Sequence, residues 1–267
     1  MISHVLTLLL VLSAVIKPIT TTTTHSKLYA VIVDTSAFWF NYRHGSNALS
    51  IYTLLKQSGV PDDQIILMLA DDVACNPRNP HAGRVFNTDD TVSRRNVYGE
   101  HVEVDFRGSE VTVENFFRLL TDRLPHGTPR SKRLLTDERS NVLLFMTGTI
   151  KCVYLVTYQT SGHGGENFLK FQDSEEINAH DLADAIGQMH ERRRFHNMLV
   201  MIDTCQADTM FDQITAPNVI TIASSSRGES SYSVLIFDKI THNVVPRGRR
   251  DWGGRHRSLH EASRVRA

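Results

Sequence analysis

The stretch Asn197-Met-Leu-Val-Met-Ile-Asp-Thr-Cys-Gln206 indicates both the kind of fold and the place of its chemistry. Its apolar residues, Met198 to Ile202, run without a polar break and stop at Asp203. Such a run is typical of a strand buried on both faces, as in parallel sheets covered by helices. In open α/β sheets the active site lies beyond the carboxyl ends of the strands, which is where Cys205 follows. Position alone leaves two interpretations, because buried free cysteines are also commonly packing residues.

A histidine between glycines offers this thiol a partner. The run Asn141-Val-Leu-Leu-Phe-Met-Thr-Gly148 is a second buried-strand pattern, and Ser161-Gly-His-Gly-Gly165 follows it. Glycine on both sides of His163 disfavours a helix and indicates a loop. An imidazole near a thiol raises the thiolate fraction and later protonates the leaving amine. The pair therefore predicts a cysteine nucleophile with a histidine base; a turn histidine and an unrelated buried thiol are the alternative.

Strand and helix patterns alternate along most of the chain. Their order predicts one α/β domain with a mostly parallel, doubly wound sheet flanked by helices, and 267 residues suffice for its core. The strands are expected at residues 28–33, 65–69, 102–106, 141–146, 198–202 and 219–223. The helices are expected to begin at Ser46 or Asn47, at Thr112, and at Asn178 or Asp181.

Charge and cysteine content exclude several classes of protein. Lys plus Arg and Asp plus Glu balance at 29 each, so no global charge favours nucleic acid or a membrane surface as a partner. The three cysteines, Cys75, Cys152 and Cys205, do not make a disulfide framework. If Cys205 stays a free thiol, at most one internal bridge is left.

The two ends of the chain differ from the expected domain. Residues 1–24 are expected to be a signal peptide, because the apolar core Val5–Ile16 is too short to span a bilayer and precedes Lys17. The mature chain is then expected to be lumenal. Residues 233–267 are expected to be a disordered tail, since residues 246–267 hold seven arginines against two acidic residues. An arm for an anionic surface is the alternative for this tail.

Longer motifs cover roughly residues 28–232 and are more specific than a cysteine–histidine pair. They include Phe38-Trp-Phe-Asn-Tyr-Arg-His44, Ala74-Cys-Asn-Pro-Arg-Asn-Pro80, Pro129-Arg-Ser-Lys-Arg-Leu134 and Phe168-Leu-Lys-Phe-Gln-Asp-Ser-Glu-Glu176. With strand-His-Gly-Gly and strand-Asp-Thr-Cys-Gln, these motifs resemble the legumain-like family of cysteine peptidases in the caspase-like clan. Within it they are most similar to the glycosylphosphatidylinositol (GPI) transamidases. The resemblance implies a three-layer caspase-like domain at residues 28–232.

The resemblance also implies roles for individual residues. Cys205 would be the nucleophile, His163 its base and acid, and Asn41 the residue that orients the imidazole. The oxyanion hole would be formed by the backbone N–H groups of Cys205 and Gly164. The pocket for the substrate side chain would be lined by Arg43, Asp203, Ser224 and Ser225. The alternatives are a turn residue for Asn41 and a strand-end cap for Asp203.

Acyl transfer is the activity that the resemblance implies. Cys205 would attack the peptide carbonyl after the attachment residue of a proprotein and expel its C-terminal signal. The amine of the GPI ethanolamine phosphate would then take the acyl group from the thioester. No residue distinguishes this transfer from hydrolysis, so a legumain-like asparaginyl endopeptidase is one alternative. A non-catalytic scaffold of the same fold is another.

Partners and a metal ion are implied in the same way. The chain would act on the lumenal side of the endoplasmic reticulum, with the other GPI transamidase subunits. Cys75 matches the position that links the catalytic subunit to a partner through a disulfide; an unpaired loop thiol is the alternative. No cofactor is implied for catalysis. A structural Ca²⁺ is implied at Asp62, Glu103, Asp105 and the backbone carbonyl of Ile65, with a solvated acidic face as the alternative.

The chain departs from the family pattern at two places. Residues 149–162 are inserted between Gly148 and His163, where the family runs directly from Met-Thr-Gly into His-Gly-Gly. Either Asn141–Met146 or Val153–Thr157 would then be the sheet strand before the histidine. The match ends after Tyr232, so this form is expected to be truncated and impaired.

Overall fold

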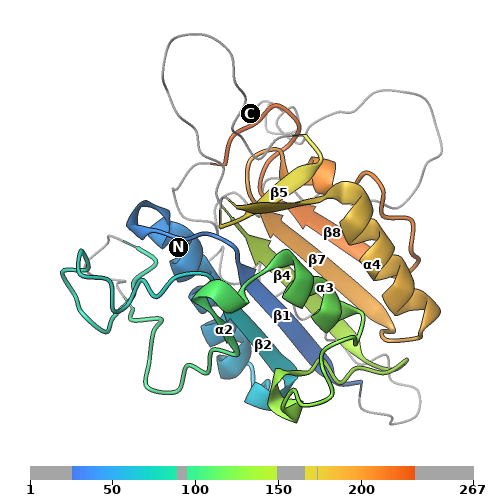
Figure 1. Ribbon diagram of the computed structural model, residues 1–267, viewed down its shortest axis with the longest axis horizontal. Coiled ribbons are helices and arrows are strands. Elements are labelled where there is room, and N and C mark those ends of the chain that lie inside the picture. The colour runs from blue at the N-terminus through green and yellow to red at the C-terminus, as the bar shows by residue number, and fades with distance from the viewer. Residues whose placement is uncertain (1–25, 89–94, 149–165, 173, 232–267) are drawn as a thin grey trace, which may run out of the picture.

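The computed structural model describes residues 26–88, 95–148, 166–172 and 174–231. Its central element is a six-stranded sheet in the order β3-β2-β1-β4-β7-β8, in which every neighbouring pair is parallel (Figure 1). The strands are β1 (Leu28–Asp34), β2 (Ile65–Leu69), β3 (Phe106–Arg107), β4 (Asn141–Thr147), β7 (Asn197–Asp203) and β8 (Val219–Ala223). The mostly parallel sheet predicted from the sequence is therefore confirmed.

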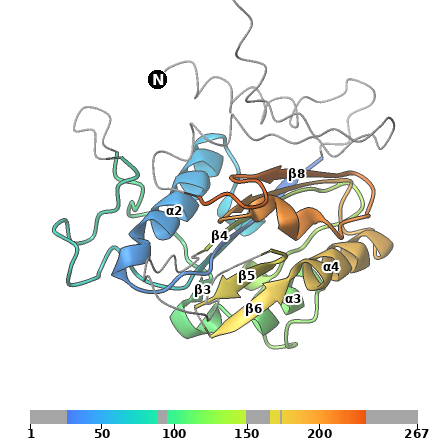
Figure 2. The ribbon, with the colours of Figure 1, turned by 90° about the horizontal axis from the view of Figure 1, so that it is seen from above.

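Helices cover both faces of this sheet. Figure 2 shows α2 (Tyr42–Gln57) on one side, and α3 (Val113–Leu120) and α4 (Ala179–Glu191) on the other. Successive strand residues point to opposite faces, so the continuous apolar runs supply two cores at once. In β4, for example, Leu143 and Phe145 pack in the core under α2, whereas Leu144 and Met146 pack in the core under α3 and α4.

Two of the helix starts follow the predicted capping pattern. The Thr112 side chain accepts a hydrogen bond from the backbone N–H of Asn115 and begins α3. Asn178 and Asp181 form a reciprocal capping box at the start of α4, so both predicted residues take part.

Two predicted boundaries are wrong. The helix expected to begin at Ser46 or Asn47 begins at Tyr42, and both residues lie buried inside α2, where the Ser46 hydroxyl donates to a backbone carbonyl. The strand expected at 102–106 is only Phe106–Arg107. The backbone N–H of Asp105 donates to the carbonyl of Leu67 in β2, but residues 102–105 form no ladder with that strand. Hydrogen bonds to β2 therefore decide the conformation of residues 102–105, although their alternation of apolar and acidic residues predicts a strand.

The strand order reverses its direction between β1 and β4. The chain runs outward from β1 to β2 and β3, then returns to β4 on the other side of β1 and continues to β7 and β8. Ligands of open α/β sheets bind at such a reversal of strand order. A separate hairpin, β5 (Phe168–Phe171) with β6 (Glu175–Asn178), lies beside α4. None of the helices in the described ranges is long and apolar enough to cross a membrane.

Candidate active site

Cys205 lies at the carboxyl edge of the sheet, two residues after β7 ends. The chain turns sharply there, because Gln206 takes a left-handed conformation (φ 51°) before the 3₁₀ helix η5 (Ala207–Phe211). The thiol is buried and forms no disulfide within the described residues. β7 pairs with β4 residue by residue, with Thr147 opposite Asp203. The strand next to the cysteine strand is therefore Asn141–Thr147, whereas the alternative, Val153–Thr157, lies outside the described residues.

Two predicted pocket residues follow β8 and contact the same turn. The Ser225 hydroxyl donates to the Thr204 carbonyl at 2.6 Å and accepts from the Ala207 backbone N–H at 3.2 Å. The Ser224 hydroxyl also donates to the Thr204 carbonyl, at 3.2 Å. Both serines are buried. They fix the backbone on either side of Cys205, which makes them supports of the Cys205 turn as well as candidate pocket residues.

The carboxylate of Asp203 is buried in a network of neutral donors. One oxygen accepts from the Ser231 hydroxyl at 2.9 Å. The other accepts from the Asn47 amide and from the Thr147 hydroxyl, each at 3.2 Å. Only 3% of Asp203 is exposed. Three donors from three different segments thus hold the carboxylate, so its contacts are tertiary, and its role in a substrate pocket stays a prediction.

Arg43 and His44 join this network from the start of α2. The Arg43 guanidinium donates to the Ser231 backbone carbonyl at 3.3 Å. His44 Nδ1 lies 2.8 Å from the Thr147 hydroxyl, and because that hydroxyl gives its hydrogen to Asp203, Nδ1 must carry a proton. Burial, with the charge of Arg43, lowers the pKa of His44 to about 3, so the ring is neutral. Its buried Nε2 is an acceptor without a partner among the described residues.

The sequence motifs gave no place in the active site to His44, Asn47, Thr147 or Ser231. A signal was present for one of them, since Thr147 ends the apolar run of β4 as Asp203 ends that of β7. Polar residues that end adjacent parallel strands meet at one edge of the sheet. Asn47 and Ser231 carry no comparable local signal, because their contacts with Asp203 span 156 and 28 residues of sequence.

Asn41 is the last residue of a 3₁₀ helix, η1 (Trp39–Asn41), and is buried at the start of α2. Its side-chain amide donates to the Ala37 carbonyl at 2.6 Å. This local bond is the one expected for a turn residue, and it leaves the role of Asn41 toward the histidine a prediction. His163 and Gly164 lie outside the described residues.

Gly148 and residues 166–167 lie close to the turn that carries Cys205. On one side, the Gly148 backbone N–H donates to the Asp203 carbonyl at 3.3 Å. On the other, the Asn167 N–H donates to the Thr209 hydroxyl at 2.8 Å, and Glu166 pairs with Arg227 at 3.3 Å. Gly148 and Asn167, which flank the residues outside the described ranges, are therefore held beside the Cys205 turn.

Comparison with known proteins identifies the family. The model of the family described as "Peptidase C13 family" matches residues 28–245. The chain belongs to the Peptidase C13 family. This membership confirms the predicted resemblance and the caspase-like fold, and makes the chain a member of a cysteine peptidase family.

Relatives within the Peptidase C13 family share about half of their residues with this chain. It is 54% identical over 223 residues to a putative GPI-anchor transamidase of Drosophila melanogaster, which covers 84% of this chain and 56% of the relative. It is 51% identical to the GPI-anchor transamidase of Saccharomyces cerevisiae (82% and 51% covered) and 53% identical to that of Homo sapiens (83% and 54% covered). The chain therefore spans about half the length of these relatives.

The predicted calcium ligands lie at the opposite, amino edge of β2 and along the approach to β3. Burial is the main reason that the pKa of Asp105 is raised to about 6, and the charges of Glu103 and Asp62 contribute in the same direction. Asp62, however, accepts from the Tyr52 hydroxyl at 2.6 Å and pairs closely with Lys56. Within the described ranges, no three His, Cys, Asp or Glu side chains are arranged to hold a metal ion. The negative charge suits a cation, but Lys56 already supplies one.

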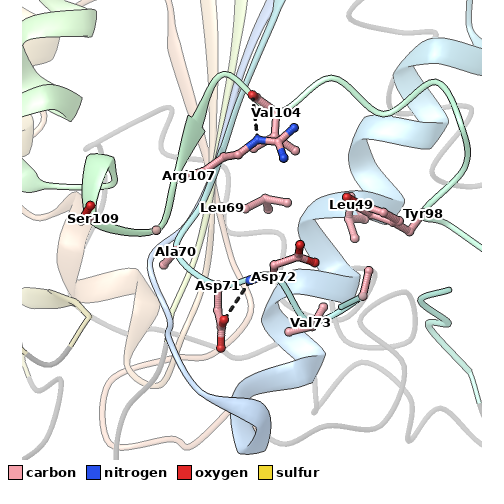
Figure 3. Close-up of a pocket in the computed structure, with 12 residues that line it drawn as sticks. Leu49, Leu69, Ala70, Asp71, Asp72, Val73, Tyr98, Val104, Arg107 and Ser109 are labelled. Carbon is pink, nitrogen blue, oxygen red and sulfur yellow. Dashed lines mark hydrogen bonds between the residues drawn. The ribbon is translucent and has the colours of Figure 1, made fainter. Parts of the chain in front are cut away.

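Cys75 lies exposed on the loop after β2 as a free thiol. Its backbone N–H donates to Asp72 at 3.0 Å, and that carboxylate raises the pKa of the thiol by hydrogen bonding and by charge. The adjoining pocket has an apolar floor that includes Leu69, between the side chains of Arg107 and Asp72 (Figure 3). The thiol is thus accessible, on a face next to a pocket of mixed character.

Proposed function

We propose that this chain carries the catalytic centre of a GPI transamidase. The observation that carries the proposal is the convergence of Cys205 with Arg43, Asp203, Ser224 and Ser225 at the carboxyl edge of the sheet. The printed names of the relatives, GPI-anchor transamidase, support the same activity. The endopeptidase and scaffold alternatives become outcomes of the test below.

The proposed chemistry is acyl transfer through a thioester. The Cys205 sulfur forms a bond to the substrate carbonyl carbon, the C–N bond breaks, and the leaving amine takes a proton from His163. The amine of the GPI ethanolamine phosphate then attacks the thioester carbonyl and returns its proton to the histidine. The new C–N bond forms as the C–S bond breaks, which regenerates the cysteine. Backbone N–H groups of Cys205 and Gly164 would stabilise the oxyanion in both steps.

The pocket chemistry supports a small, neutral side chain at the attachment residue. Both oxygens of Asp203 accept hydrogen bonds from the protein, and Arg43 donates to the Ser231 carbonyl. The oxygens of Asp203 are thus already engaged as acceptors, which leaves them less available to a substrate side chain than those of a free carboxylate. A serine, glycine or alanine would meet mainly hydroxyls and backbone.

Complementation of cells that lack the catalytic subunit tests the proposal. The intact chain is compared with Cys205→Ala, His163→Ala and a version without residues 149–162, and surface display of a GPI-anchored reporter is measured. We expect at least one of the intact chain and the version without residues 149–162 to restore surface display of the reporter. Cys205→Ala and His163→Ala should restore none. Equal rescue by Cys205→Ala would favour the scaffold. Cleavage of an asparaginyl peptide by the purified chain, without reporter display, would favour the endopeptidase.

We further propose that the chain acts on the lumenal side of the endoplasmic reticulum with the other subunits of the complex. The exposed Cys75 thiol supports a disulfide to one of them. Non-reducing electrophoresis of the complex should show a band of higher mass that Cys75→Ser abolishes and Cys205→Ser keeps. A band unaffected by Cys75→Ser would contradict this assignment.

Calcium binding is also a proposal, supported by the shared negative charge of Asp62, Glu103 and Asp105. The ion would have to displace Lys56 from Asp62. We expect Ca²⁺ to raise the melting temperature of the intact chain, and Glu103→Gln to abolish that increase. Glu100→Gln, an exposed neighbour, is the control. An increase that persists in Glu103→Gln would argue against this site.

A further inference from the structure

Ser231 contacts three parts of the active site at once. Its backbone N–H donates to the Cys205 sulfur at 3.0 Å. Its hydroxyl donates to Asp203 at 2.9 Å, and its carbonyl accepts from Arg43 at 3.3 Å. The residue is 7% exposed, so these bonds form largely away from water.

The loop that ends at Ser231 is tied to the residue after the nucleophile. The Gln206 backbone N–H donates to the Glu229 carbonyl at 2.9 Å, and the Gln206 side chain accepts from the Gly228 N–H at 3.1 Å. Glu229 closes the loop on itself, because its carboxylate accepts from the Ser226 N–H at 2.9 Å. The loop and the nucleophile turn therefore form one hydrogen-bonded unit.

We propose that Ser231 is a positioning residue that stabilises the thiolate of Cys205 through its backbone N–H, with its hydroxyl anchoring that amide to Asp203. The inference rests on the proposed function, in which Cys205 is the nucleophile. A hydrogen bond to an ionised acceptor is stronger than one to its neutral form, so the amide favours the thiolate over the thiol. It thereby offsets the burial of the sulfur, which alone favours the thiol.

Proline substitution tests the amide directly, because proline has no backbone N–H. Full-length Ser231→Pro is compared with Ser230→Pro, since Ser230 is the adjacent loop residue. Alkylation of Cys205 by iodoacetamide is followed by mass spectrometry of the peptide that contains it, from pH 5 to 10. We expect Ser231→Pro to slow alkylation about tenfold at pH 6 and to move the rate profile to higher pH. Ser230→Pro should keep the wild-type profile.

A second pair of variants tests the anchor without a proline. Ser231→Ala removes the hydroxyl bond to Asp203 and keeps the amide, whereas Ser231→Thr keeps both. We expect a smaller, two- to fourfold loss at pH 6 in Ser231→Ala and recovery in Ser231→Thr. The same pH profile in folded Ser231→Pro and Ser230→Pro would overturn the inference. If Ser231→Pro does not fold, a wild-type profile for Ser231→Ala would overturn it.

These outcomes separate the inference from the proposed function. The alkylation profile reports the thiolate population whether or not the chain transfers an acyl group. A shifted profile together with full rescue by Cys205→Ala would leave the positioning role intact and remove the catalytic one. An unshifted profile together with no rescue by Cys205→Ala would do the reverse.

Discussion

Asp34 ends β1 as a buried carboxyl group, and its titration should contribute a measurable part of the pH dependence of stability. Burial is the main reason that its pKa is raised from an ordinary 3.8 to about 8, and the charge of Asp71 contributes in the same direction. The Ser36 backbone N–H donates to one oxygen at 2.9 Å and opposes the shift. At neutral pH the folded chain therefore holds a protonated Asp34. Asp34→Asn keeps the acceptor for Ser36 and removes the titration.

The sign and size of the effect follow from proton linkage. Between pH 3.8 and about 8 the unfolded chain has lost the Asp34 proton while the folded chain retains it. Asp34 therefore takes up a proton on folding, so its own contribution to stability falls as pH rises through this window, by up to about 1.4 kcal/mol per pH unit. From pH 5 to pH 7 the wild-type chain should lose about 3 kcal/mol relative to Asp34→Asn.

Urea unfolding at pH 5, 6 and 7 measures this difference. The free energy of unfolding of Asp34→Asn minus that of the wild type should grow at each step. Asp184→Asn, at an exposed position on α4, is the matched control and should keep a constant difference from the wild type. A difference between Asp34→Asn and the wild type that is the same at all three pH values would refute the reasoning.

Two further substitutions test packing and buried hydrogen bonds. A Cβ at Gly148 would lie 2.2 Å from the Thr35 hydroxyl, so Gly148→Ala should destabilise the fold by at least about 2 kcal/mol in urea unfolding. Gly187→Ala, which meets open space on α4, should instead stabilise it by about 0.5–1 kcal/mol. The buried Arg194 donates to backbone carbonyls in two segments, so Arg194→Met should cost about 2–4 kcal/mol. The same change at exposed Arg193 should cost less than about 0.5 kcal/mol.

The sheet could be predicted well because its strands carry their own signal. Residues 65–69 and 219–223 form strands at the predicted bounds, since an unbroken apolar run is buried in whichever layer it joins. The prediction of a strand at 102–106 was wrong, because residues that only run alongside the edge of a sheet can also alternate between apolar and acidic. The start of α2 was missed because the aromatic loop before it continues into the helix without a capping side chain.

The candidate site could be predicted only in part. Cys205 follows from an apolar run and a position at the end of a strand, and Arg43, Asp203, Ser224 and Ser225 from the family motifs. The donors that hold Asp203 depend on the distances between distant segments, which a linear sequence does not reveal. Ser231 is the clearest case, because its importance lies in a backbone N–H that every residue except proline has.

The residue-by-residue pairing of β7 with β4 determines where the Cys205 thiol lies. Alternate residues of β7 fill the two cores, with Val200 packed toward α3 and α4 and Met201 toward α2. A slip of one residue would exchange these side chains between layers and part Asp203 from Thr147. The packing of these apolar side chains therefore fixes the position of the Cys205 sulfur. Deletion of a single residue from β7 should displace the thiol from the hydrogen-bond network around Asp203, although the sequence around Cys205 is unchanged.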